Sequence, residues 1–205
     1  MPIYNKHNLL FTHVPKTGGT AVDRWLGGAD NFVGHVSLNY MYTVLPHPQK
    51  HLYQKFTILR DPVDRIRSAW NHHVRKNTPL LKKYPAVFEK GFENGLLSRQ
   101  YEQMITDEYS MIAIHFLPMD WLFRIDKTRA HNPGIVINFD NLQDEVYDLA
   151  EKVKLKITEP FIVRQSNYDR KPLSTHAQQR FDYLYREETI LYDYYAKNTS
   201  RINSI

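Results

Sequence analysis

Three short apolar runs divide the chain, and a polar turn and a segment of helical character follow each of them. The runs are residues 9–14, 56–59 and 134–139. Continuous runs of this length, rich in aliphatic and aromatic residues, are typical of parallel strands buried on both faces. Strand, turn and helix repeated in this order predict an α/β fold with a central, mainly parallel sheet flanked by helices.

The helices are predicted from their start and stop signals. Gly27-Gly28 ends a first helix that begins near Ala21. Asp61 is a natural N-cap and Pro62 a natural first residue for a helix that reaches about Lys76. Further expectations are a strand-like segment at 31–38, a loop at 45–48 and broken helices over 79–101. Residues 115–122, rich in aromatic and apolar side chains, are expected in the core or in a cleft wall. A helix from 140 to about 153 and a last helix over 175–195, followed by a polar tail, complete the prediction.

Composition indicates one globular domain over residues 1–205, with 42% hydrophobic and 24% charged residues. No run approaches the length of a membrane helix, and the first residues lack the apolar core of a signal peptide. There is no cysteine, which excludes disulfides and thiolate metal sites. A net charge of +5 favours anionic partners, but the basic residues are dispersed, which argues against nucleic acid.

The loop after the first strand has the chemistry of an anion cradle. It reads Lys16-Thr17-Gly18-Gly19-Thr20. Two glycines allow a close approach of the backbone, the start of the next helix offers N–H groups, and lysine and threonine add a charge and hydroxyl donors. The alternative is a plain turn with a solvated lysine. The NTPase pattern G-x-x-x-x-G-K-[ST] is absent, because this lysine precedes the glycines.

A second constellation lies at the end of the next strand. Arg60 ends the strand, and Ser68 lies two turns into the helix that follows. Ligands bind at the carboxyl ends of parallel strands, where an arginine can hold a phosphate with two hydrogen bonds and a serine can add one. Arg60-Asp61-Pro62 also has a purely local interpretation, as a capped helix start with an ion pair, and the two interpretations are compatible.

The segment His13-Val14-Pro15-Lys16-Thr17-Gly18-Gly19-Thr20 resembles the 5′-phosphosulfate loop of the sulfotransferases, most of all the carbohydrate branch that includes heparan sulfate 2-O-sulfotransferase. Arg60 and Ser68 resemble that family's 3′-phosphate motif. The resemblance implies a P-loop-type three-layer fold. It also implies transfer of a sulfuryl group from 3′-phosphoadenosine 5′-phosphosulfate (PAPS) to a hydroxyl of a carbohydrate-like acceptor, leaving 3′-phosphoadenosine 5′-phosphate (PAP), without a metal.

Gly34-His35-Val36-Ser37 resembles the segment that carries the family's catalytic base, which makes His35 the expected general base. A lone histidine in an apolar segment is otherwise more often a core or surface residue. Lys16 is then expected to stabilise the leaving phosphate, and His13 to be structural. Residues 15–20 would line the 5′ side, and the later loop 163–172 would close over the nucleotide.

In that later loop the resemblance is loose, so Arg164, Asn167 and Lys171 are candidates for phosphate contacts and a solvated connector is the alternative. We expect a cytoplasmic, soluble enzyme without a membrane span, whose acceptor and oligomeric state the sequence leaves open. Two other hypotheses stay open. One is an ATP-dependent phosphotransferase, for which Asp140 is the only candidate magnesium ligand at a strand end. The other is a polyanion-binding module without catalysis.

Overall fold

In this computed structural model the chain forms two compact units, which are described separately. The first unit contains residues 1–60, 119–165 and 191–205, and the second contains residues 61–118 and 166–190. The prediction of a single domain stays a prediction. The residues described are 2–28, 31–32, 34–37, 40–41, 52–106, 113–123, 133–156, 160–162, 168 and 170–202, with only the backbone of 31–32 and 196–202.

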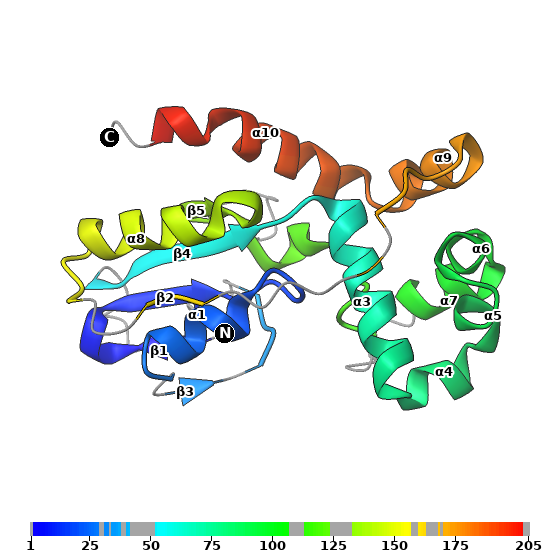
Figure 1. Cartoon of the computed structure of the whole chain (residues 1–205), viewed down its shortest axis with the longest axis horizontal. Helices are drawn as coiled ribbons and strands as arrows, with labels where there is room; N and C mark the ends of the chain where they lie inside the picture. The colour runs from blue at the N-terminus through cyan, green and yellow to red at the C-terminus, as the bar shows by residue number, and fades with distance from the viewer. Residues whose placement is uncertain are drawn as a thin grey trace. The chain divides into compact units, whose positions relative to one another are not determined.

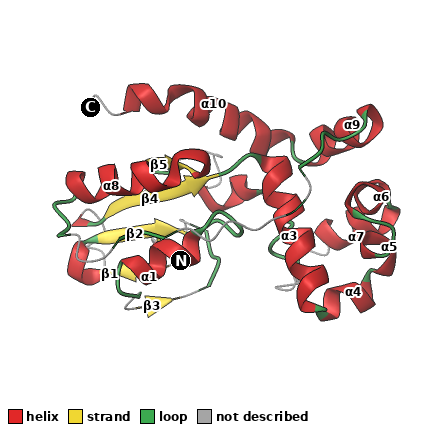
Figure 2. Cartoon of the chain, in the orientation of Figure 1, coloured by secondary structure: helices red, strands yellow, loops and turns green. Residues whose placement is uncertain are grey.

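The first unit contains a five-stranded sheet in the order β3-β1-β2-β4-β5 (Figures 1 and 2). The strands are β1 (Pro2–Tyr4), β2 (Leu9–Thr12), β3 (Asn31–Phe32), β4 (Gln54–Leu59) and β5 (Ile135–Asn138). The predicted strands β2, β4 and β5 pair in parallel, which confirms the α/β prediction. The strand β1 pairs antiparallel with both β2 and β3. It was not predicted, whereas β3 lies within the strand-like segment predicted at 31–38.

Successive side chains along each strand point to opposite faces of the sheet. Both faces are apolar, and helices cover each of them. One face packs against α1 (Gly19–Trp25) and α8 (Leu142–Lys152), and Figure 1 shows α8 alongside β4 and β5. The other face packs against the 3-10 helix η3 (Met119–Phe123) and against Leu191 and its neighbours in α10 (Arg186–Ile202). The three-layer prediction is therefore confirmed. The remaining 3-10 helices of this unit are η1 (Asn5–His7) and η4 (Phe139–Asn141).

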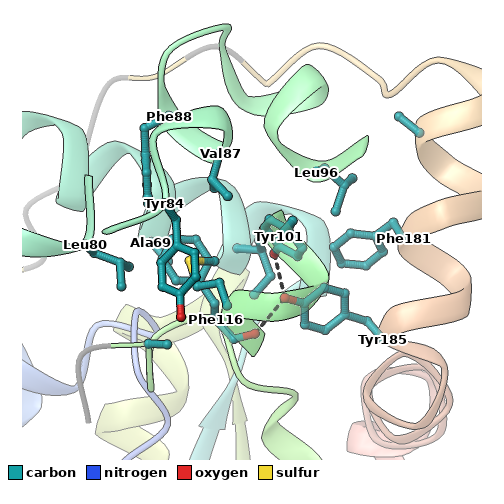
Figure 3. Close-up of a cluster of buried hydrophobic side chains, with 14 residues drawn as sticks. Ala69, Leu80, Tyr84, Val87, Phe88, Leu96, Tyr101, Phe116, Phe181 and Tyr185 are labelled. Carbon is teal, nitrogen blue, oxygen red and sulfur yellow. Dashed lines mark hydrogen bonds between the residues drawn. The ribbon is translucent and has the colours of Figure 1, made fainter. Parts of the chain in front are cut away.

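The described part of the second unit is helical. Its elements are α3 (Pro62–Lys76), α4 (Pro79–Lys83), α5 (Pro85–Phe88), α6 (Phe92–Leu97), α7 (Arg99–Thr106), α9 (Thr175–Leu184) and the first residues of α10. Asp61 caps α3 as predicted, since its carboxylate accepts from the Asp64 N–H at 2.9 Å. Figure 3 shows the apolar core that these helices share, with Tyr101 and Tyr185 hydrogen-bonded in its middle.

Several local expectations are corrected. Of the described residues in the predicted 31–38 segment, 31–32 pair in the sheet and 34–37 are not a strand. The last helix is two helices, because Tyr185 leaves helical geometry with φ −118° and ψ 22°. Residues 198–202, predicted as a polar tail, continue α10. The predicted loop 45–48 lies outside the described residues.

Candidate functional site

The predicted anion cradle lies between β2 and α1 in the first unit. Its backbone has positive φ at Lys16 (67°) and Gly18 (81°). This left-handed region is energetically unfavourable for residues other than glycine. The Thr17 hydroxyl donates to the Val14 carbonyl at 2.9 Å, and the Thr17 side chain is fully buried. The Thr17 hydroxyl therefore holds the loop in shape, while Thr20 is exposed at the start of α1.

The two glycines of the cradle are required by the protein's own packing. A Cβ built on Gly18 would lie 2.9 Å from Leu142 Cδ2 and 3.2 Å from Phe139 Cε2. A Cβ on Gly19 would lie 2.1 Å from the Nε2 atom of His13. Real Cβ atoms do not approach other heavy atoms this closely, so the strand end and the β5–α8 junction hold the loop from two sides.

Arg60 joins the end of β4 to the cradle. Its Nη1 donates to the Lys16 carbonyl at 3.0 Å, and its guanidinium carbon lies 4.2 Å from the centroid of the Phe139 ring. The side chain is 5% exposed, so this contact is made with little competing water. The structure thus brings together Arg60 and the Lys16 loop, as their places at the ends of adjacent parallel strands predict.

His35 also lies at the cradle. Its Nδ1 is 2.8 Å from the His13 carbonyl oxygen, and the His13 and His35 rings meet edge to face at 4.8 Å. A carbonyl only accepts, so Nδ1 carries the proton and Nε2 keeps a lone pair in the neutral ring. Burial lowers the pKa of His35 below its ordinary value, which favours that neutral ring. Geometry and electrostatics together leave a basic nitrogen beside the loop.

His13 is the more deeply buried of the two histidines, as the expectation of a structural role requires. Its ring stacks on Phe11 at 5.1 Å between centroids, and Phe11 stacks in turn on Phe56 in the neighbouring strand. Burial, with a smaller contribution from His35, lowers the pKa of His13 to about 3. The His13 ring is therefore neutral at pH 7.

Ser68 and Lys171 belong to the second unit. Ser68 lies on α3 in the second unit and is 7% exposed. Lys171 is exposed, and its backbone carbonyl accepts from Arg67 Nη2 at 2.7 Å, a contact between the later loop and α3. Arg164 and Asn167 lie outside the described residues. The predicted phosphate contacts of Ser68, Arg164 and Lys171 stay predictions.

Sequence reasoning missed the contact of Phe139 with Arg60, and it predicted a structural role for His13 without the contact with Gly19. Phe139 directly follows β5, the third parallel strand, so its place at the carboxyl edge of the sheet was the available signal. His13 precedes the loop by three residues, and nothing in the sequence shows that its ring reaches Gly19. Within the described residues no helix is long and apolar enough to cross a membrane, and no three metal-binding side chains gather to hold an ion.

The comparison with family models gives one match. The model described as "Sulfotransferase family" matches residues 2–197, which is nearly the whole chain. No curated protein and no solved structure matches the chain. The family generally takes a nucleotide-linked sulfuryl donor and a hydroxyl acceptor, and the mixed, mainly parallel sheet described above is consistent with its α/β fold. The chain belongs to the sulfotransferase family.

Proposed function

We propose that this sulfotransferase uses PAPS as donor and a hydroxyl of a carbohydrate-like molecule as acceptor. The observation that carries the proposal is the hydrogen bond between His35 Nδ1 and the His13 carbonyl, which holds a neutral imidazole beside the anion cradle. PAPS supplies a sulfuryl group on a phosphate leaving group. The remaining requirements are charge stabilisation, a base and correct placement, and they fall to this chain's own residues.

The 5′ side of the donor is assigned to Pro15, Lys16, Thr17, Gly18, Gly19 and Thr20. The Lys16 ammonium would offset the negative charge that grows on the leaving oxygen. The fixed loop backbone costs no reorganisation during the reaction, because the Thr17 hydroxyl, the His13 ring and the Arg60 guanidinium already hold it.

The base is assigned to His35. Its Nε2 lone pair would accept the proton of the attacking hydroxyl, a step that typically contributes about 10²–10⁴-fold to the rate. A lowered pKa keeps the ring neutral, and therefore basic, below pH 6.5. The expected pH profile loses activity only as the pH falls through that lowered pKa.

The 3′-phosphate is assigned to Arg60 and Ser68, with Arg164 and Lys171 contacting the nucleotide from the later loop. Arg60 suits this role because its planar guanidinium carries several N–H groups: one donates to the Lys16 carbonyl, and others could donate to a phosphate. The same residue would then link the two ends of the donor site. Loss of Arg60 should therefore weaken donor binding more than it slows transfer.

The acceptor class rests on the resemblance of residues 13–20 and 34–37 to the heparan sulfate 2-O-sulfotransferase branch, and on the net charge of +5. A positively charged protein attracts an anionic polysaccharide at long range. We therefore expect transfer to anionic polysaccharides in preference to small phenols.

The test is calorimetric titration with PAP, with ATP as control, followed by transfer from ³⁵S-labelled PAPS to polysaccharide and phenol panels. PAP should bind without magnesium, and Arg60→Ala should weaken that binding. His35→Ala should lower kcat at least 100-fold with PAP affinity retained, while His7→Ala, a histidine of the same unit outside the site, changes neither. Magnesium-dependent preference for ATP would instead favour a phosphotransferase, and polysaccharide binding without PAP binding would favour a polyanion-binding module.

A further inference from the structure

On the basis of the proposed function, we infer that His13 is a positioning residue that fixes the cradle and the base relative to one another. It contacts both through different atoms. Its ring lies against the backbone of Gly19, and its carbonyl oxygen accepts the hydrogen bond from His35 Nδ1 at 2.8 Å. A single residue at the end of β2 thus joins the loop that would bind the donor to the group that would deprotonate the acceptor.

The ring contact explains why residue 19 is glycine. A Cβ at this position would lie 2.1 Å from Nε2, 2.2 Å from Cδ2 and 3.0 Å from Cε1 of His13. The ring cannot swing away easily, because it stacks on Phe11, which itself stacks on Phe56 within the sheet. The absence of a side chain at Gly19 is therefore imposed from inside the protein, independently of any ligand that approaches from outside.

The carbonyl contact fixes the base. With Nδ1 committed to the His13 carbonyl, the ring of His35 is held in one tautomer with Nε2 as the acceptor. The edge-to-face contact at 4.8 Å between the two rings restricts the tilt of His35 and helps to keep it from water. Replacing His13 with alanine retains the backbone carbonyl but removes the contact between the rings, so the contribution of the His13 ring can be measured separately.

The first experiment tests the ring against the loop without relying on activity. Thermal melting compares the wild type, Gly19→Ala, His13→Ala and the double variant. Gly19→Ala should lower Tm in the wild-type background and have little further effect when the His13 ring is absent. His13→Asn, which keeps a short planar side chain but lacks the distal ring atoms, repeats the cycle if His13→Ala fails to fold. Additive losses of Tm would overturn the inference.

The second experiment tests the coupling to His35. Imidazole ¹⁵N NMR of the wild type should find Nδ1 protonated and Nε2 unprotonated in His35, and His13→Ala should raise the pKa of His35 toward 6.5, because part of its burial is removed. His7→Ala is the matched control and should leave the pKa of His35 unchanged. An unchanged pKa in His13→Ala would overturn the inference, whether or not the protein turns over PAPS.

The third experiment links the arrangement to catalysis. His13→Ala should lower kcat by roughly 10²-fold, as a misplacement of about 1 Å does, with a smaller change in KM for PAPS. In a His35→Ala background the same substitution should cost little more, since it would act through a base that is already missing. Equal losses in both backgrounds would mean that His13 only supports the fold. Wild-type protein that neither binds PAP nor transfers would refute the proposed function, while the melting and NMR results would still decide the role of His13.

Discussion

Replacing Arg65, which lies between Arg60 and Ser68 in the sequence, should destabilise the second unit severely. Arg65 and Glu188 are both fully buried. Their side chains pair through two hydrogen bonds of 2.7 Å, from Nε and Nη2 of Arg65 to the two carboxylate oxygens. Two further Arg65 N–H groups donate to the carbonyls of His115, at 3.0 Å, and Leu117, at 2.9 Å. Arg65→Met would therefore leave a buried carboxylate and two buried carbonyls without these donors.

The expected loss follows from the burial. Removing one partner of a fully buried ion pair costs about 3–5 kcal/mol, because the other charge remains in a site that water does not reach. In a protein of this size each 1 kcal/mol corresponds to about 2–4 °C in Tm, so Arg65→Met should lower Tm by roughly 6–20 °C. The double variant Arg65→Met/Glu188→Leu removes the uncompensated charge, so it should recover most of the loss.

The assay is thermal unfolding followed by circular dichroism, with Arg75→Met as control. Arg75 lies exposed in the last turn of α3, so its replacement should change the free energy of unfolding by less than about 0.5 kcal/mol. A single variant that melts within 2 °C of the wild type, or a double variant no better than the single, would refute this reasoning. Below its Tm, Arg65→Met should bind PAP as the wild type does, since a fully buried guanidinium paired to a carboxylate offers nothing to a phosphate.

Three further predictions concern stability. Burial in the folded state lowers the pKa of His13 to about 3, so the unfolded state binds a proton first as the pH falls. The free energy of unfolding should therefore drop by about 1 kcal/mol more between pH 6.5 and 5.5 in the wild type than in His13→Asn. Denaturant titration at the two pH values would measure this difference. Tyr185→Phe should lower the free energy of unfolding by about 2–3 kcal/mol and Tyr101→Phe by about 1 kcal/mol, because the Tyr185 hydroxyl donates to a buried carbonyl and also accepts from Tyr101. Thermal melts that rank the two variants in the reverse order would contradict the hydrogen bonds drawn in Figure 3. Gly134→Ala should lower the free energy of unfolding by about 1–3 kcal/mol more than Gly27→Ala. Both glycines have positive φ, but of the two only Gly134 has backbone beside it, where a Cβ would lie 2.3 Å from the Lys55 carbonyl oxygen.

The sequence predicted those features that depend on neighbouring residues. The cap of α3 needs only Asp61 and the N–H three residues later, and Pro62 fits the first turn, so this helix start was found at the correct residue. The three parallel strands were found because burial on both faces leaves a continuous apolar run. The strand, turn and helix around Gly18 and Gly19 were predicted correctly because they are contiguous in sequence.

Features that depend on distant contacts were missed. The strand β1 was missed, and the strand predicted at 31–38 was too long, because β1 and β3 have only three and two residues, too few for a pattern, and form strands by pairing with each other and, for β1, with β2. The last helix was predicted as one because its apolar positions continue through residue 185. Helical geometry is interrupted at Tyr185, which is fully buried and donates its hydroxyl to the Phe116 carbonyl, 69 residues away in sequence.

The arginines of α3 and the strand before it show why a motif gives residue types and not roles. Arg60, Arg65 and Arg67 lie within eight positions, and all three are buried. Arg60 holds the cradle through the Lys16 carbonyl, Arg65 is neutralised by a glutamate 123 residues away in sequence, and Arg67 donates to the Lys171 carbonyl. Burying a guanidinium is costly without a partner, so each must have one, but the sequence does not say which. Of the three, Arg60 is the one that contacts the cradle, so the donor-site hypothesis depends on Arg60 and leaves Arg65 to the stability of the second unit.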